Sequence, residues 1–280
     1  MLVRIPPPRS TATHLTWGWA AILAAMTLLD SAILGIVEGI TEFLPISSTG
    51  HLILTSTLLG LPSTEFLKSF EIAIQLGAIL AVVVLYWRSF LDFSILKKIA
   101  AAFIPTAIIG LLLHDLAKTY LLGNVEVVLW ALGIGGVALI VFELLHKEKE
   151  DGADSVTTIT YPQAIAVGVF QALAIIPGVS RSAATIIGGL VMGVRRVAIV
   201  EFSFLLAVPV MAAATALDLF KSAHAFSSAD AGNLGVGFVV SFVVALLAIR
   251  FLLQYVRKHT FISFGIYRIV AALLFFLFVL

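Results

Sequence analysis

Long apolar segments separated by short polar stretches make up most of the chain. A helix that crosses a bilayer needs roughly 20 apolar residues, with about 17 to 25 tolerated. On this measure the pattern predicts spanning helices at 66–87, 97–113, 125–145, 198–219, 233–256 and 261–280. Two further apolar segments, 31–60 and 160–194, are interrupted at their centres by proline and polar residues. Non-helical backbone at membrane depth is tolerated only where protein buries it or where it lines a watery cavity, so we expect two re-entrant hairpins.

The composition supports this interpretation. Of 280 residues, 61% are hydrophobic and 12% are charged, with a mean hydropathy of +1.12. Soluble domains carry about 25% charged residues, so an integral membrane protein is indicated. The continuous runs of Leu, Ala, Gly and Ile differ from the short alternating strands of a membrane barrel, and we expect an all-α polytopic membrane protein. A net charge of +1 gives no sign of a nucleic-acid partner, and the absence of cysteine excludes disulfides and thiolate chemistry.

The N-terminal segment differs from the rest of the chain. Residues 1–13 are basic and proline-rich, and Pro6–Pro8 cannot lie within a stable helix. The following apolar stretch resembles a signal peptide, but it continues directly into the first interrupted segment, which argues against cleavage. We expect 1–25 to be an extension of a single membrane domain, 26–280. Whether Met26 is the natural start stays open.

Lysine and arginine in short loops predict the orientation of the helices, because cytoplasmic loops carry an excess of both. Two or more lie in each of 88–98, 146–160, 195–196 and 257–258. One each lies in 114–124 and 220–232. We expect the first set of loops to be cytoplasmic and the second to be external, an assignment that alternates consistently along the chain.

The two hairpins then enter from opposite sides of the membrane. Segment 31–60 enters from outside and 160–194 from the cytoplasm, so 31–145 and 160–280 each contain one hairpin and three spanning helices. The second copy is inverted relative to the first. A weak local echo relates AILGIVE at Ala32 to AIAVGVFQ at Ala164, with an insertion of one residue. Broken helices in inverted repeats meet near the midplane and build the binding site there, so we expect the hairpins to meet.

The first hairpin carries carboxylates and hydroxyls that are costly at membrane depth and therefore indicate function. Glu38 and Glu42 share one helix face and would repel each other unless a cation or a proton lies between them. Mg²⁺ or Ca²⁺ would suit these oxygens, and a protonated Glu that merely bridges helices is the alternative. Ser47, Ser48 and Thr49 exceed what helix capping needs and favour an anion site, with His51 one turn further as a proton-transfer candidate or a structural residue.

In the second hairpin Pro177 and Gly178 break the helix, and Ser180, Ser182 and Thr185 surround an arginine. The Arg181 guanidinium offers a planar fork that matches phosphate oxygens. An arginine that extends to the lipid headgroups is the weaker alternative. Together the hairpins offer groups suited to phosphoryl transfer within the membrane. A transporter or lipid flippase is the alternative, because inverted repeats with broken helices are typical of transporters.

These residues resemble the bacterial undecaprenyl pyrophosphate phosphatase family, also called the bacitracin-resistance protein family. The motifs are EGITEFLPISSTGH from Glu38 to His51, PGVSRS from Pro177, EIAIQLG from Glu71 and EFSFLLAVP from Glu201. The likeness runs from about Ala32 to the C-terminus and leaves out 1–25. It implies an inner-membrane hydrolase that removes the terminal phosphate from a C55 polyprenyl pyrophosphate for cell-wall synthesis, with bacitracin resistance as a consequence.

The resemblance also implies roles for individual residues. Glu38 and Glu42 take the cation or act as acid and base, and a divalent cation (Mg²⁺ or Ca²⁺) is the expected cofactor. The nucleophile is Ser48, Ser47 or an activated water, with His51 nearby. The expected diphosphate-binding residues are Thr49, Gln75, Ser180, Arg181, Ser182 and Thr185. We expect the site to open to the periplasmic side, with the polyprenyl lipid and membrane lipid as partners, no nucleic acid, and monomer or homodimer left open.

Overall fold

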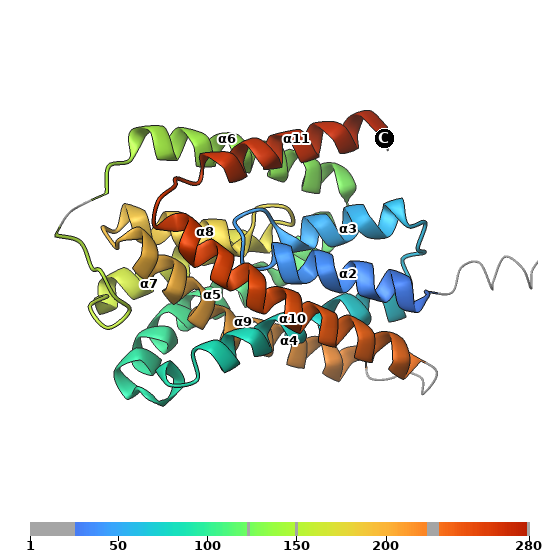
Figure 1. The fold of residues 1–280 in the computed structure, drawn as a ribbon, viewed down its shortest axis with the longest axis horizontal. Helices are drawn as coiled ribbons and strands as arrows, with labels where there is room; N and C mark the ends of the chain where they lie inside the picture. Colours follow the sequence, from blue (N-terminus) through green and yellow to red (C-terminus); the bar gives the residue numbers. More distant parts are fainter. Residues whose placement is uncertain (1–25, 122–123, 149–150, 223–229, 279–280) are drawn as a thin grey trace, which may run out of the picture.

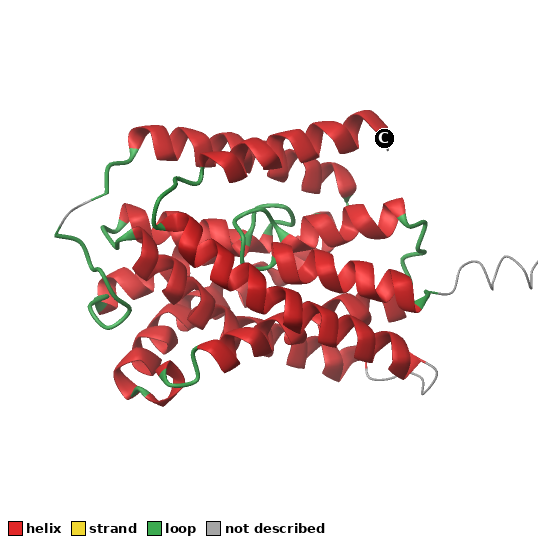
Figure 2. Cartoon of the chain, in the orientation of Figure 1, coloured by secondary structure: helices red, strands yellow, loops and turns green. Residues whose placement is uncertain are grey.

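The computed structural model describes residues 26–121, 124–148, 151–222 and 230–278, and these ranges are helical apart from their connections (Figure 2). Five helices are long and apolar enough to cross a membrane. They are α4 (Glu65–Leu85), α5 (Phe93–Tyr120), α6 (Val125–Leu145), α9 (Arg196–Ser222) and α10 (Ala231–Val256). A shorter apolar helix, α11 (Ile262–Phe278), follows them. The chain is therefore a polytopic membrane protein, as the hydropathy pattern predicts, and the expectations for 1–25 lie outside the described residues.

Each predicted span corresponds to one of these helices, and the largest difference is at α5. The apolar stretch predicts 97–113, but the helix begins at Phe93 because the Asp92 carboxylate accepts from the Ser94 and Ile95 N–H groups at 2.8 and 3.3 Å. At the other end it continues to Tyr120. Hydropathy therefore located the apolar centre of the helix, whereas a capping side chain sets its start.

Both interrupted segments form helical hairpins. The first is α2 (Leu28–Thr41) with α3 (Ser48–Leu58), and the second is α7 (Tyr161–Gln171) with α8 (Arg181–Val191), joined through the short η2 (Ala172–Ile175). The two hairpins enter from opposite ends of the bundle and their tips meet in its middle (Figure 1). The Ser182 hydroxyl of one tip donates to the Phe43 carbonyl of the other at 2.7 Å. The predicted meeting of the hairpins is confirmed.

Glycines allow the first helix of each hairpin to lie directly against a long helix. Helix α2 packs along α10, where a Cβ atom at Gly35 would lie 2.7 Å from the Gly237 carbonyl oxygen. Helix α7 packs along α5, where a Cβ at Gly168 would collide with the Ala102 carbonyl. Helices α6 and α11 pair with each other and form a separate layer beside the hairpin tips (Figure 1).

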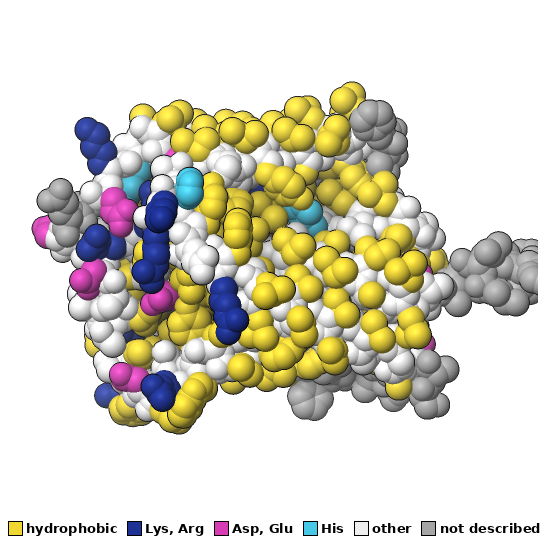
Figure 3. Space-filling view, in the orientation of Figure 1, with side chains coloured by type: hydrophobic (Ala, Val, Ile, Leu, Met, Phe, Trp, Pro, Cys, Tyr) yellow, Lys and Arg dark blue, Asp and Glu magenta, His cyan; other side chains and the backbone are white. Residues whose placement is uncertain are grey.

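Charged side chains gather at one end of the molecule, and apolar side chains cover most of the remaining visible surface (Figure 3). The connections that contain 88–98, 146–160, 195–196 and 257–258 all lie at this end (Figure 1). The C-terminal ends of α5 and α9 and the N-terminal ends of α6 and α10 lie at the opposite end. The two sets of loops are thus separated as the charge pattern predicts. Which end faces the cytoplasm stays a prediction.

A buried ion pair joins α6 and α9 to the residue just before α11 at the charged end. Arg196 binds Glu143 through two hydrogen bonds, and their side chains are only 11% and 1% exposed. The Glu143 carboxylate also accepts from the Phe261 N–H at 3.1 Å. The Arg196 guanidinium lies over the Phe261 ring, 4.9 Å from its centre. Breaking a buried ion pair leaves an uncompensated charge and costs far more than losing an exposed one.

We therefore expect Glu143→Ala to lower the free energy of unfolding by up to about 3–5 kcal/mol, because the buried Arg196 then keeps only its longer contact with Glu148, at 3.7 Å. Glu65→Ala is the matched control, since its pair with Lys68 is exposed on both sides and should cost at most about 1 kcal/mol. Denaturant unfolding of the detergent-solubilised protein measures both. Equal losses for the two variants would contradict the assigned role of the buried pair.

Candidate active site

Each hairpin tip turns through a serine in an unusual backbone conformation. Ser47 has φ of 74° and Ser180 has φ of 76°, and no other non-glycine residue in the described part of the chain has positive φ. Both cap the helix that follows: the Ser47 hydroxyl accepts from the Gly50 N–H at 3.4 Å, and the Ser180 hydroxyl from the Ala183 N–H at 3.2 Å. Non-glycine residues adopt this conformation at a cost, and they cluster at functional sites.

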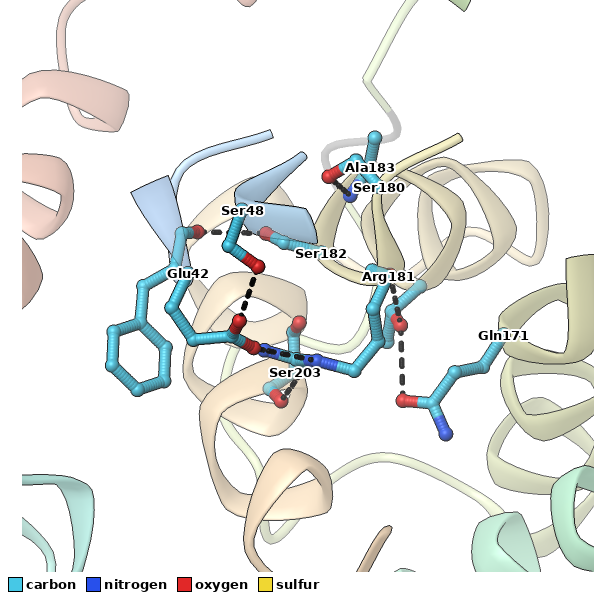
Figure 4. Close-up of polar contacts among 10 residues, drawn as sticks. Glu42, Ser48, Gln171, Ser180, Arg181, Ser182, Ala183 and Ser203 are labelled. Atoms are coloured by element: carbon cyan, nitrogen blue, oxygen red, sulfur yellow. Dashed lines mark hydrogen bonds and ion pairs between the residues drawn. The ribbon is translucent and has the colours of Figure 1, made fainter. Parts of the chain in front are cut away.

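Between the two tips lies a hydrogen-bonded triad of hydroxyl, carboxylate and guanidinium (Figure 4). The Ser48 hydroxyl donates to Glu42 Oε2 at 2.5 Å. Arg181 donates to Glu42 Oε1 from Nη2 at 3.0 Å and from Nε at 3.3 Å, and it donates from Nη1 to the Ser203 carbonyl at 3.1 Å. A serine whose proton points at a carboxylate is the arrangement from which a general base can activate a nucleophile.

A small cavity of about 130 Å³ adjoins the triad. It contains seven of the predicted site residues: Glu42, Ser47, Ser48, Thr49, Gln75, Ser180 and Arg181. Both hairpins contribute to its wall, and α4 supplies Gln75. The helices that start at the two tips leave their first N–H groups without partners inside the helix, and such N-termini favour anions. The arrangement can therefore hold an anionic group beside a potential nucleophile.

Ser182 and Thr185 lie behind this cavity rather than in its wall. Ser182 makes the bond to Phe43 described above, and the Thr185 hydroxyl contacts the Arg181 carbonyl at 2.7 Å and Gln171 Oε1 at 3.2 Å. Their hydrogen bonds join the second tip to the first and to α7. In this geometry both residues support the arginine-bearing turn and do not face the cavity.

Glu38 is the least satisfied polar group near the site. Its side chain is 0% exposed, and neither carboxylate oxygen has a hydrogen-bond partner among the described residues. The Glu42 carboxyl lies close enough to hydrogen-bond Glu38 when one of the two carries a proton, and the charges of Glu71 and Arg181 also act on Glu38. A buried carboxylate in this state needs a proton or a cation. The described residues contain no group of three or more His, Cys, Asp or Glu side chains that could hold a metal ion, so a cation here would depend on few protein ligands.

His51 lies on the first turn of α3 and points away from the cavity. Its Nδ1 is 2.7 Å from the Ser47 carbonyl, and its Nε2 is 2.8 Å from the Tyr267 hydroxyl of α11. The two rings stack with their centres 5.5 Å apart. Because both nitrogens are engaged, His51 fixes the Ser47 turn in this structure, and the predicted proton transfer by His51 stays a prediction.

The sequence interpretation missed Arg268, a fully buried arginine on α11. All its hydrogen-bond acceptors are backbone carbonyls, and they include carbonyls of both hairpin tips. A signal was present, because an ionisable residue inside a predicted span indicates function as strongly as one inside an interrupted segment. The apolar character of span 261–280 as a whole conceals this single arginine.

Fold and site together define a polytopic helical membrane protein with a carboxylate–serine–arginine centre between two re-entrant hairpins. A model of the family described as "Bacitracin resistance protein BacA" matches residues 31–274, and the chain belongs to this family. Named relatives are similar over nearly their whole length. The Sulfurihydrogenibium sp. protein is 53% identical over 90% of this chain and 99% of its own length. The Aquifex aeolicus protein is 51% identical over 89% and 98%. The Wolinella succinogenes protein is 50% identical over 89% and 97%. All three are called "Undecaprenyl-diphosphatase".

Proposed function

We propose that this protein is an undecaprenyl-diphosphatase, an enzyme that hydrolyses C55 polyprenyl pyrophosphate to undecaprenyl phosphate and inorganic phosphate. The observation that carries the proposal is the Ser48 hydroxyl on the Glu42 carboxylate, facing Arg181 in one cavity. The relatives that bear this name match almost the entire chain. Membership of the bacitracin resistance family agrees with an enzyme that recycles the cell-wall lipid carrier.

The geometry supports a division of labour in the reaction. Arg181 and the N-termini of α3 and α8 hold the diphosphate, whose oxygens replace Glu42 as the partner of the guanidinium. Glu42 then accepts the Ser48 proton while Ser48 Oγ attacks the terminal phosphorus. A bond forms between Oγ and phosphorus, the bond from phosphorus to the bridging oxygen breaks, and Glu42 passes its proton to that oxygen as undecaprenyl phosphate leaves. Water then attacks the phosphoserine, Glu42 transfers a proton from the water to Ser48 Oγ, and inorganic phosphate is released. Ser47 or a water molecule in the attacking position remains the alternative.

A divalent cation fits the site as a second part of the proposal. Glu38 and Glu42 lie one helical turn apart, and the Glu38 oxygens lack partners among the described residues. Mg²⁺ is usually bound by one or two carboxylates together with substrate phosphates and waters, so a sparse protein ligand set is sufficient. When bound, the cation would neutralise charge on the phosphate oxygens. Glu38 and Glu42 are the residues that would hold it.

The two halves of the chain, 31–145 and 160–280, are proposed to be inverted repeats within one membrane domain. One constant interval separates the capping threonines Thr27 and Thr160, the glycines Gly35 and Gly168, and the tip serines Ser47 and Ser180. This register needs no one-residue insertion, unlike the local echo in the sequence. The packing of α2 on α10 also resembles that of α7 on α5. The opposite entry of the hairpins supports inversion (Figure 1).

Location and assembly complete the proposal. The relatives are bacterial, and the helices make a multi-pass protein, which supports the bacterial inner membrane. The arginine- and lysine-rich end is proposed to be cytoplasmic, so α2 and α3 enter from the periplasm. The hairpin that carries Glu38, Glu42 and Ser48 would then enter the membrane from the periplasmic side. A homodimer stays a prediction.

Phosphate release from undecaprenyl pyrophosphate by the purified protein tests the activity. We expect Glu42→Gln to lower kcat by about 10²–10⁴-fold, because a general base is lost, and Ser48→Ala to lower it at least as much. Thr57→Ala is the matched control, since this α3 hydroxyl bonds only to its own helix at Ile53. A wild-type protein that moves the lipid across liposomes but releases no phosphate would favour a flippase. Full activity of Ser48→Ala would assign the attack to Ser47 or water.

The role of Glu38 can be tested through the metal requirement. If Glu38 helps to hold the cation, Glu38→Gln should raise the Mg²⁺ concentration needed for half-maximal phosphate release by about tenfold or more, as one of few ligands is lost. If Glu38 only carries a proton, glutamine replaces it closely and the Mg²⁺ dependence stays unchanged. A titration of activity against Mg²⁺, with Ca²⁺ in parallel, distinguishes the two.

The orientation can be tested with single cysteines, because the chain contains none of its own. Cysteines at Lys118 and Lys221 should react with an impermeant thiol reagent in intact cells, since both positions lie near the end proposed to be periplasmic. A cysteine at Lys97 should react only after lysis. The opposite labelling pattern would invert the proposed orientation.

A further inference from the structure

Arg268 binds five backbone carbonyls while lying fully buried in the layer formed by α6 and α11. Its Nε and Nη2 reach the Leu132 and Ala131 carbonyls of α6 at 3.2 and 3.0 Å. Its Nη1 and Nη2 also reach carbonyls of the hairpin tips. No carboxylate in the described part of the chain forms an ion pair with Arg268. Burial of an arginine at membrane depth is costly, so packing α11 on α6 does not explain its presence.

The tip contacts of Arg268 connect both hairpins through one group. Nη1 donates to the Pro45 carbonyl at 3.4 Å and to the Val179 carbonyl at 3.0 Å, and Nη2 donates to the Gly178 carbonyl at 2.9 Å. Pro45 and Gly178 stand at equivalent positions, each two residues before the tip serine with positive φ. A single guanidinium therefore holds the same point of both turns.

These contacts fix backbone groups next to the cavity. The C=O and N–H of a planar trans peptide point in opposite directions. An arginine that holds the Val179 carbonyl therefore also sets the direction of the Ser180 N–H, and Ser180 and Gly178 both line the cavity. The following residue is Arg181, whose guanidinium meets Glu42 of the other tip. The position of Arg181 relative to Ser48 thus depends on the separation of the two turns.

Helix α6 is shaped to admit this side chain. A Cβ atom at Gly135 would overlap Arg268 Nη2 and lie 2.8 Å from Cζ, and one at Gly136 would lie 2.7 Å from the Gly265 carbonyl oxygen. Two residues before Gly135, a Cβ at Gly133 would meet only the Ala272 Cβ, at 3.9 Å. Gly135 therefore makes room for the guanidinium and Gly136 for the close approach of the α11 backbone, whereas Gly133 does neither.

We propose that Arg268 is a positioning residue for the phosphatase site: it locks the two hairpin tips together so that Arg181 of one meets Glu42 and Ser48 of the other. The effect of Arg268 on catalysis rests on the proposed function. The hydrogen bonds from Arg268 to the two tips do not depend on it. Arg268 does not itself line the cavity and contacts no member of the triad, so it acts through the tip carbonyls, among them that of Gly178 in the cavity wall.

The test uses the full chain with Arg268→Lys and Gly135→Ala, and with Gly133→Ala as the matched control. Lysine keeps the charge but cannot span both tips and α6 with a planar fork. Alanine at 135 displaces the guanidinium without removing it. Spin labels are attached to cysteines introduced at the exposed positions Leu58 and Val191, one on each hairpin. Double electron–electron resonance then measures the distance between the two labels and thus the separation of the hairpins. This measurement does not require activity.

We expect both variants to widen the distribution of label distances and to lower kcat for phosphate release by tenfold or more, with KM changed less than kcat. Gly133→Ala should match the wild type in both. A wild-type distance distribution in Arg268→Lys would overturn the proposal even if activity fell. Wild-type kcat with widened distances would overturn it too, because the separation of the tips would then not govern catalysis. A wild-type protein without phosphatase activity would refute the proposed function and leave the distance result interpretable.

Discussion

Backbone groups that a helix frees inside a membrane must find partners within the protein, and this requirement organises the centre of the molecule. Both hairpins break near the middle of the bundle, at Pro45 and at Pro177–Gly178. The freed carbonyls of the tips are bound by Arg268, and the freed N–H groups of α3 and α8 are partly capped by Ser47 and Ser180. What the caps leave uncovered faces the cavity. The same requirement that ties the tips together therefore also creates a site for an anion.

The free protein holds this site in a self-neutralised state. Glu42 pairs with Arg181 at 3.0 Å, with side chains 5% and 11% exposed. An isolated carboxylate or guanidinium charge would be costly at this depth, and in this pair each charge compensates the other. In the proposed reaction, a diphosphate that binds the guanidinium would free the Glu42 carboxylate to act on Ser48, to which it is already hydrogen-bonded. The pair thus stabilises this centre and, by the same contact, holds the Glu42 carboxylate beside Ser48, where the proposed reaction needs a base.

The sequence predicted the apolar elements and the meeting of the hairpins well, because both follow from local pattern and loop charge. Span 125–145 coincides with α6, and the tip residues from Glu42 to Arg181 do converge. The sequence could not predict contacts between distant segments with no pattern of their own. Arg268 joins carbonyls of three separate segments, and His51 is engaged by Tyr267 of the last helix. The positive φ of Ser47 and Ser180 could not be predicted either, because glycine indicates a possible positive φ and serine does not.

Similar scaffolds in the two halves carry different chemistry at one pair of equivalent positions. Gln171 in the second hairpin donates to Thr106 at 3.1 Å and accepts from Thr185 at 3.2 Å, so its neutral amide is satisfied. Glu38 in the first hairpin has the same interval to its tip serine, but its oxygens lack partners among the described residues. A satisfied amide serves structure, whereas a buried unsatisfied carboxylate is retained only if something else occupies it. The asymmetry places the demand for a proton or cation on the side of Glu42 and Ser48, and it leaves the second hairpin to provide the arginine.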